Sequence, residues 1–247
     1  MSHVALKEQY DREGFVVARQ LLAPAEFADL QQNLERYLRK VVPTLSPSDA
    51  FYVNRARPET LKQLHRMDRD PFFAHYAQHP AWLGLAAALV GEIAQPQEPE
   101  WFNKPAGTNS PTPPHQDNYY FCLVPPRVTT LWMALDEIDD ENGCLRYARG
   151  SHLPGVRPHE RSSVLGFSQT IAGYDEQLED EVAIHLRPGD VVAHHGNTIH
   201  RAEANRSATR QRRALAIVYR GESCRRDEAA FERYSSALKA QQAALGG

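Results

Sequence analysis

A histidine and an aspartate stand one residue apart at His115 and Asp117, in the stretch PHQDNYYF. In an extended strand, residues i and i+2 point to the same side, so these side chains could share a metal ion. A third ligand is expected from His200, which follows the turn sequence RPGD much later in the chain. Two histidines and one carboxylate leave three coordination positions open, which suits non-haem Fe(II) enzymes. An isolated H-x-D triplet also occurs by chance, so other residues must support this hypothesis.

His194 and His195 are alternative third ligands, because they lie in the same segment as His200. We interpret both as turn residues or as histidines at the edge of the core, since they lie nearer the RPGD turn. His200 is therefore the preferred candidate for the third ligand.

A basic strand, RQRRALAIVY, follows His200. Strand alternation places Arg212 on one face with small or apolar residues, namely Ala214, Ala216 and Val218. An arginine on such a face indicates a buried guanidinium that binds a carboxylate. Arg210 and Arg213, in contrast, fit exposed charges on an edge strand.

The overall composition is that of an ordinary globular protein, with 247 residues, 42% hydrophobic and 24% charged residues, and a net charge of −3. This near balance of charge predicts neither a nucleic-acid nor a membrane partner. The N-terminus lacks an apolar signal core, which predicts a cytoplasmic protein. Cys122, Cys144 and Cys224 are odd in number and widely spaced, which argues against a disulfide framework.

The pattern of secondary structure changes near residue 97. Helical spacing of apolar residues precedes it, for example in 23–42, and a proline separates two helices within 70–92. After it, we expect short strands near 98–104, 127–138, 143–148, 181–186, 190–194, 198–203 and 211–220. No long helix alternates with these strands, so the pattern predicts a mainly β protein, a sandwich or jelly roll with flanking helices.

A single domain is predicted over 1–247, because no linker or repeat interrupts the chain. Its expected parts are a helical N-terminal part at about 1–95, a jelly-roll core at about 96–222 and a C-terminal helix at about 225–245. The polar segment 153–180 is expected to be a long loop over the mouth of the core.

Ordered sequence blocks give the chain a family resemblance. They read GFVVARQLLAPAEFADL, FNKPAG…PPHQD, LWMALDEIDDENGCLRYARGSH, LRPGDVVAHHGNTIHRAEANRS and RRALAIVY. With these blocks the chain resembles the phytanoyl-CoA dioxygenase family of Fe(II)/2-oxoglutarate oxygenases over about residues 8 to 220. The resemblance implies a cupin-like double-stranded β-helix in which His115, Asp117 and His200 hold iron.

The resemblance also implies a site for 2-oxoglutarate. Arg212 matches the arginine that pairs with the distal carboxylate, and Arg210 is the alternative if the alignment contains a gap. Trp132 matches an aromatic residue that borders the cosubstrate, and Lys62, expected on a helix, resembles a basic residue near it. Lys104 alternates onto one strand face with Phe102 and Glu100, and we include it among the cofactor-binding candidates.

The implied reaction uses Fe(II), 2-oxoglutarate and O2, and releases succinate and CO2 while a small-molecule C–H bond is hydroxylated. Ascorbate is a supporting additive. Asp117 favours hydroxylation, because halogenating relatives have a small residue there. The alternatives are a non-catalytic cupin-like binding protein and a metal hydrolase on the same fold. The sequence does not indicate an oligomeric state.

The substrate is expected beside the metal, against Asn118, Tyr119 and Tyr120. Other candidates for lining its site are Tyr52, Asn54, Arg55, Arg157, His159 and Arg161. If several of these basic residues face inward, the substrate is an anionic small molecule. The family does not fix the substrate, because one fold serves many of them.

Overall fold

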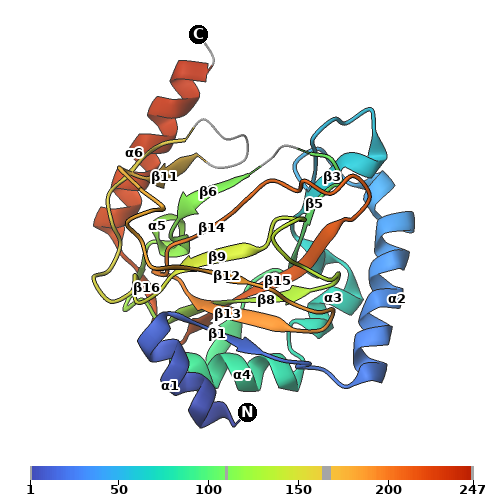
Figure 1. The fold of residues 1–247 in the computed structure, drawn as a ribbon, viewed down its shortest axis with the longest axis horizontal. Helices are drawn as coiled ribbons and strands as arrows, with labels where there is room; N and C mark the ends of the chain where they lie inside the picture. Colours follow the sequence, from blue (N-terminus) through green and yellow to red (C-terminus); the bar gives the residue numbers. More distant parts are fainter. Residues whose placement is uncertain (1, 109–110, 163–167, 246–247) are drawn as a thin grey trace.

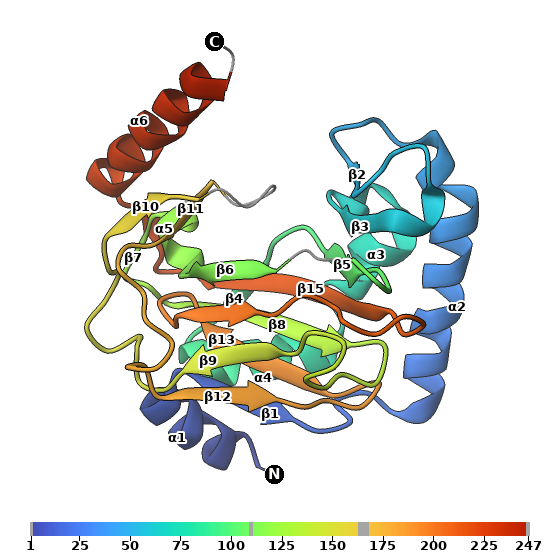
Figure 2. The ribbon, with the colours of Figure 1, turned by 45° about the horizontal axis from the view of Figure 1, so that its top comes forward.

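The computed structural model describes residues 2–108, 111–162 and 168–245. A larger and a smaller antiparallel sheet pack against each other, and helices cover the outer face of the larger sheet (Figures 1 and 2). This is the jelly-roll arrangement with flanking helices that the strand pattern predicts.

The larger sheet has the strand order β1-β13-β8-β15-β5-β3-β2, and β4 also pairs with β15. Its strands are β1 (Phe15–Ala18), β2 (Ala50–Tyr52), β3 (Leu61–Leu64), β4 (Ala94–Pro96), β5 (Glu100–Lys104), β8 (Val128–Ala134), β13 (Val191–His195) and β15 (Arg212–Gly221). The smaller sheet has the order β12-β9-β14-β6. Its strands are β6 (Thr112–His115), β9 (Leu145–Ala148), β12 (Glu181–Ile184) and β14 (His200–Ala202).

Shorter strand pairs lie outside these sheets. They are β7 (Leu123–Val124) with β16 (Arg225–Arg226), and β10 (His159–Arg161) with β11 (Gln169–Ile171). The second pair lies within the segment expected to be a long loop. Residues 163–167 of that segment, and residues 1, 246 and 247 of the expected domain, lie outside the described residues.

Helices α1 (His3–Glu13), α2 (Pro24–Lys40), α3 (Pro71–Tyr76) and α4 (Pro80–Val90) pack around the larger sheet. The chain also forms the short 3-10 helices η1 (Val42–Thr44), η2 (Pro58–Thr60) and η3 (Met67–Arg69). Proline occupies the first turn of each of α2, α3 and α4, where its missing N–H costs no helical hydrogen bond. Two further helices are α5 (Asp117–Phe121) and α6 (Glu228–Leu245), of which α6 projects from the body in Figure 2. No described helix is long and apolar enough to cross a membrane.

Strand β15 shows how the sequence separates the two sides of the larger sheet. Leu215, Ile217 and Tyr219 are fully buried against the helices. The alternate residues Ala214 and Ala216 face the smaller sheet together with Trp132, and Arg212 lies on their side of the strand. Because these alanines are small, the space between the sheets is not filled beside Arg212. The predicted sharing of one strand face is confirmed.

The structure corrects parts of the expected pattern. The segment 1–95 is not purely helical, since β1, β2, β3 and β4 join the larger sheet. Lys62 lies on β3 rather than on a helix. The His115–Asp117 segment is not a continuous strand either, because β6 ends at His115 and Asp117 begins α5.

Candidate metal and cosubstrate site

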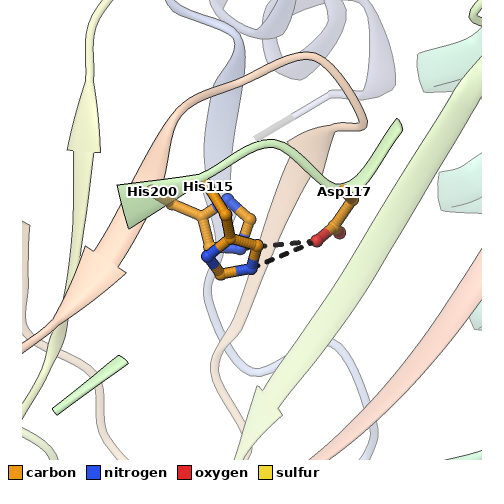
Figure 3. A group of neighbouring side chains, drawn as sticks. All are labelled: His115, Asp117 and His200. Carbon is orange, nitrogen blue, oxygen red and sulfur yellow. Dashed lines mark ion pairs between the residues drawn. The ribbon is translucent and has the colours of Figure 1, made fainter. Parts of the chain in front are cut away.

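His115 and His200 lie opposite each other on neighbouring strands of the smaller sheet, β6 and β14. Their ring centroids are 4.2 Å apart. Asp117 turns back toward them from the start of α5, so that its Oδ1 lies 3.6 Å from the Nε2 atom of each histidine (Figure 3). Two prolines precede His115, and they fit because β6 is an edge strand of its sheet.

Backbone contacts orient both histidine rings. Nδ1 of His115 lies 2.8 Å from the Pro113 carbonyl, and Nδ1 of His200 lies 3.1 Å from the Thr198 carbonyl. With Nδ1 carrying the proton, each Nε2 keeps a lone pair that faces Asp117. These contacts therefore assign the tautomers. The Nε2 atoms of His115 and His200 and Oδ1 of Asp117 converge on one point.

The pKa values of His200 and Asp117 are shifted in the directions that suit a metal site, which needs a neutral histidine and an ionised carboxylate. Burial, together with His115 and His194, holds the pKa of His200 well below its usual value. Burial alone would raise the pKa of Asp117, but His200, His115 and His194 lower it well below its usual range. The buried donor set of two imidazoles and one carboxylate therefore fits Fe(II).

His194 lies beside these residues rather than in a turn, which corrects its expected position. It is on β13, only 2% exposed, and its Nε2 lies 3.0 Å from Asp117 Oδ2. Sequence reasoning missed this contact, because the pairing of β13 with β8 is not visible in the residue pattern. His195 is the next residue along β13, and neither of the two described groups of metal-ligating side chains, His115, Asp117 and His200 or Asp140, Cys144 and His185, includes His194 or His195.

A cavity of about 610 Å³ opens beside the three metal-ligand candidates. Arg212 lines its inner end, is 5% exposed, and has no hydrogen-bond partner for Nε within the described part of the chain. Its guanidinium lies 5.2 Å from the ring of Trp132, which also lines the cavity. Burial lowers the pKa of Arg212 to about 10, so the group is still a cation at neutral pH. A buried cation facing a cavity fits a carboxylate ligand.

Lys104 and Lys62 line the same inner end of the cavity. Lys104 stands opposite Arg212 in the β5–β15 register. Burial, and then the neighbouring Arg212, hold the pKa of Lys104 well below its usual value. Burial also lowers the pKa of Lys62. We name this group of Arg212, Lys104 and Lys62 the basic end of the cavity.

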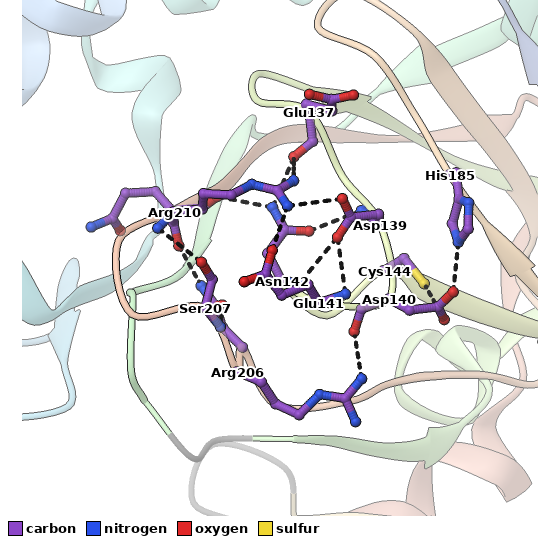
Figure 4. Close-up of polar contacts among 12 residues, drawn as sticks. Glu137, Asp139, Asp140, Glu141, Asn142, Cys144, His185, Arg206, Ser207 and Arg210 are labelled. Atoms are coloured by element: carbon purple, nitrogen blue, oxygen red, sulfur yellow. Dashed lines mark hydrogen bonds and ion pairs between the residues drawn. The ribbon is translucent and has the colours of Figure 1, made fainter.

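Arg210 lies outside the cavity in the described structure, among acidic residues of the loop that follows β8 (Figure 4). Its Nη1 lies 2.8 Å from Asp139 Oδ2 and 2.8 Å from Glu141 Oε2. Arg210 is therefore already paired with carboxylates, whereas Arg212 faces the cavity.

The three residues expected to contact the substrate lie differently from one another. Tyr120 lines the cavity, and its hydroxyl donates to the Gln169 carbonyl at 2.9 Å. Asn118 is turned to the backbone of Leu123, with which it exchanges two hydrogen bonds of 3.1 and 3.0 Å. Tyr119 stacks on His159 with a centroid separation of 3.9 Å, and is not among the described lining residues. Phe121 and Leu123 line the cavity in place of Asn118 and Tyr119, because residues 117–121 form a helical turn and not a strand.

Farther along β5 from Lys104, where Glu100 stands opposite Ala216, the cavity is lined by acidic and polar residues that sequence reasoning did not assign. Glu98, Glu100, His65 and Gln63 line it. His65 Nδ1 lies 3.1 Å from Glu100 Oε1. Burial, and then Asp68 and Glu100, raise the pKa of Glu98. We name this group the acidic end. Its signal in the sequence was the alternation that placed Glu100 on the face of Lys104.

Solved structures with the same fold include iron and 2-oxoglutarate complexes. The epimerase SnoN in complex with Fe3+, alpha ketoglutarate and nogalamycin RO matches 90% of this chain and 84% of its own, with a TM-score of 0.72 and 23% identity. EvdO2 from Micromonospora carbonacea var. aurantiaca complexed with 2-oxoglutarate matches 92% of this chain and 93% of its own, with a TM-score of 0.70 and 24% identity. The carbocyclase SnoK, described as alpha ketoglutarate dependent, matches 89% of this chain and 84% of its own at 25% identity and a TM-score of 0.69. Fold and site together define the class of iron- and 2-oxoglutarate-dependent oxygenases.

The family follows from the sequence comparisons. The family model described as phytanoyl-CoA dioxygenase (PhyH) matches residues 10–214, so the chain belongs to the phytanoyl-CoA dioxygenase family. The peroxisomal phytanoyl-CoA dioxygenase of Bos taurus is 25% identical over 228 residues, which are 87% of this chain and 67% of that protein. Phytanoyl-CoA dioxygenase 1 of Oryza sativa subsp. japonica is 34% identical over 156 residues, covering 62% of this chain and about half, 54%, of that protein. The predicted family, enzyme class and cofactors are confirmed.

Proposed function

We propose that this chain hydroxylates a C–H bond of a small molecule with Fe(II), 2-oxoglutarate and O2. The observation that carries this proposal is the convergence of His115, Asp117 and His200 on the same cavity as the buried Arg212. Iron and 2-oxoglutarate, when bound, supply the oxidising chemistry, with release of succinate and CO2. The protein itself positions the reactants and excludes competing reactions.

The residues of the chain have separate tasks in this proposal. His115, Asp117 and His200 would hold the iron through two imidazole nitrogens and one carboxylate oxygen. Arg212 binds the distal carboxylate of 2-oxoglutarate by charge-assisted hydrogen bonds, and Lys104 and Lys62 add positive charge at the same end. Trp132 forms a wall beside Arg212, since the guanidinium lies over its ring.

Asp117 supports oxygenation rather than halogenation, because a carboxylate occupies the position that chloride would need. The structural neighbours nevertheless include proteins named as an epimerase and a carbocyclase. Oxidation without oxygen transfer is therefore the second outcome to test. Incorporation of ¹⁸O from ¹⁸O2 into the organic product separates hydroxylation from these outcomes.

The substrate proposal rests on the open part of the cavity. Tyr120, Phe121 and Leu123 offer an apolar wall, and Glu98 and Glu100 lie at the acidic end. A small molecule with an apolar part and hydrogen-bond donors fits these walls. An anionic substrate stays a prediction without support from the loop, because Arg157 pairs with Glu179 at 2.5 Å and Arg161 is exposed. Neither arginine is among the described lining residues.

The alternatives remain a non-catalytic binding protein and a zinc hydrolase. A hydrolase has no use for the buried Arg212 beside the metal-ligand candidates. A non-catalytic relative needs no intact triad. The presence of both features supports the oxygenase.

The experiment is turnover of 2-oxoglutarate. Purified protein with Fe(II), 2-oxoglutarate and ascorbate under air should form succinate, slowly alone and faster with a substrate from a metabolite panel. His115→Ala should lose Fe(II) binding and turnover. His75→Ala is the matched control, because His75 is an exposed histidine on α3 that neither lines the cavity nor belongs to a described group of metal-ligating side chains, and it should leave both unchanged. Absence of 2-oxoglutarate binding to the Fe(II)-loaded protein would contradict the proposal.

A further inference from the structure

His194 is neither one of the proposed metal ligands nor one of the residues proposed to bind 2-oxoglutarate. It stands opposite Thr130 in the β13–β8 register, and both residues are buried. Both side chains reach the same atom of Asp117: His194 Nε2 lies 3.0 Å from Oδ2, and Thr130 Oγ1 lies 2.7 Å from it. The oxygen Oδ1, which faces His115 and His200, is the one that these two donors leave available.

The direction of these hydrogen bonds can be assigned from the acceptor. An ionised carboxylate only accepts, so His194 Nε2 and Thr130 Oγ1 both donate to Oδ2. Nδ1 of His194 lies 2.9 Å from the hydroxyl of Tyr147, which is fully buried. A neutral His194 with its proton on Nε2 accepts from the Tyr147 hydroxyl through Nδ1. The hydrogen bonds that run from the Tyr147 hydroxyl through His194 to Asp117 thus pair both ring nitrogens without a further buried charge.

The ring of His194 also supports the ligand histidine. Its centroid lies 4.4 Å from that of His200, and the Tyr147 ring stacks on His200 at 5.6 Å. Tyr147 is itself stacked on Phe15, with a centroid separation of 4.7 Å. Interdigitated rings in a close-packed core cannot reorient separately, so the geometry of Asp117 and that of His200 are coupled through His194.

We propose that His194 is a positioning residue that, with Thr130, holds Asp117 as a one-oxygen metal ligand in an orientation fixed by Tyr147. A carboxylate that bound through both oxygens would occupy a further coordination position. With Oδ2 engaged by His194 and Thr130, Asp117 would offer a bound metal Oδ1 alone. The proposal rests on the proposed metal site, but it can be tested without turnover.

The test measures binding of Co(II) to the full chain by calorimetry and by its visible absorption spectrum. His194→Phe keeps a ring but removes the donor, and we expect Co(II) to bind about 10- to 100-fold more weakly, the usual effect of losing an outer hydrogen-bond partner of a ligand. His194→Gln can place an amide N–H toward Oδ2, and it should recover most of the affinity and the spectrum. Tyr147→Phe should weaken Co(II) binding by a smaller factor, because Nε2 can still donate.

Several outcomes would overturn this assignment. One is wild-type affinity and an unchanged Co(II) spectrum in His194→Phe. Another is a loss in His194→Gln equal to that in His194→Phe, which would indicate a role in packing alone.

Pulsed EPR of bound Cu(II) should detect two imidazole ligands, and a third would make His194 a ligand. If His194→Phe does not fold, Thr130→Val provides the same reading, since it removes the other donor to Oδ2. Failure of wild-type protein to bind Co(II) at all would instead contradict the proposed metal site.

Discussion

The two ends of the cavity handle charge in opposite ways. At the basic end, Arg212 and Lys104 are each about 5% exposed, and Arg212 forms no ion pair within the described part of the chain. At the acidic end, Glu100 is 29% exposed and is already paired with His65, which is 32% exposed. Burying the Arg212 guanidinium without an ion-pair partner is costly, whereas the Glu100–His65 pair, about one third exposed, costs little and contributes little. The basic end is therefore built for a charged ligand, and the acidic end is close to balance by itself.

This difference predicts which end determines cosubstrate binding. A buried guanidinium that lines a cavity gains most when it binds a carboxylate, because the ligand then offsets the cost of burying the charge. The acidic end faces solvent, so a substrate group there exchanges water for protein contacts at small net gain. Changes at the basic end should therefore affect 2-oxoglutarate strongly, and changes at the acidic end should affect the substrate weakly.

The largest effect is expected for Arg212→Ala. Removing one partner of a buried charge pair costs about 2–5 kcal/mol, which corresponds to a roughly 30- to 5,000-fold weaker binding of 2-oxoglutarate. Calorimetry on protein loaded with Mn(II) measures this constant without turnover. Arg210→Ala is the matched control, because it removes a nearby arginine that is paired with Asp139 and Glu141 outside the cavity. A larger loss of 2-oxoglutarate affinity in Arg210→Ala than in Arg212→Ala would contradict the assignment of Arg212.

A smaller effect is expected for Lys104→Met. This substitution should raise the stability of the protein but lower its affinity for 2-oxoglutarate. Methionine fills a similar volume without an ionisable group, so the protein without ligands should be more stable at neutral pH by about 1 kcal/mol, because burial disfavours the charged form of Lys104. The 2-oxoglutarate affinity should fall about tenfold, because one positive charge is lost from the basic end. Urea unfolding and calorimetry measure these two quantities. A loss of stability together with unchanged affinity would show that Lys104 is structural.

The pH dependence of 2-oxoglutarate binding tests the contribution of Lys104 in a second way. The pKa of Lys104 is held low in the empty protein by burial and by Arg212. An arriving carboxylate favours the charged lysine, so binding should take up a proton and strengthen as pH falls, at most tenfold per pH unit. Calorimetry in buffers of different ionisation enthalpy detects the proton. Lys104→Met should remove this uptake.

Much of the site was visible in the sequence because its signals are local. The close spacing of His115 and Asp117, and the alternation that isolates Arg212 among alanines, are each read within one short segment, although Asp117 begins a helix rather than continuing the strand of His115. The family blocks then fixed which distant histidine completes the triad. His194 could not be assigned in this way, because its contact with Asp117 depends on how β13 pairs with β8, and strand pairing leaves no mark in a single segment.

The fold shows the same limit. Most strands of the jelly-roll core were predicted within a few residues, since alternation and turn residues mark them, but β6 was not among the predicted strands. Strand β3 was missed because Leu61, Leu64 and Met67 follow each other at intervals of three, which imitates a helix. Their burial against the helices is a property of the assembled sheet, as is the placement of Lys62 in the cavity. The hydrogen bonds of Asn118 with the Leu123 backbone could not be foreseen for a similar reason, because α5 is a single short turn that a strand pattern conceals.

The smallest effect is expected at the acidic end, for Glu100→Gln. Burial lowers the pKa of His65, but the hydrogen bond and charge of Glu100 outweigh it and raise the pKa above its usual value. The stabilisation from this pair is therefore present in full below about pH 6.5 and is lost as the pH rises through the folded-state value. Because both groups are about one third exposed, it should amount to less than about 1 kcal/mol.

Glu100→Gln should lower the pKa of His65 in an NMR titration and remove the acidic-side stabilisation, while 2-oxoglutarate affinity changes less than about twofold. Gln63→Ala is the control at the same end, because it removes a polar neighbour of Glu100 without removing the carboxylate. The substrate, once identified, should bind more weakly to Glu100→Gln through its hydrogen-bond donors. If Glu100→Gln instead weakened 2-oxoglutarate as strongly as Lys104→Met, charge would act over the whole cavity, and the division into two ends would be wrong.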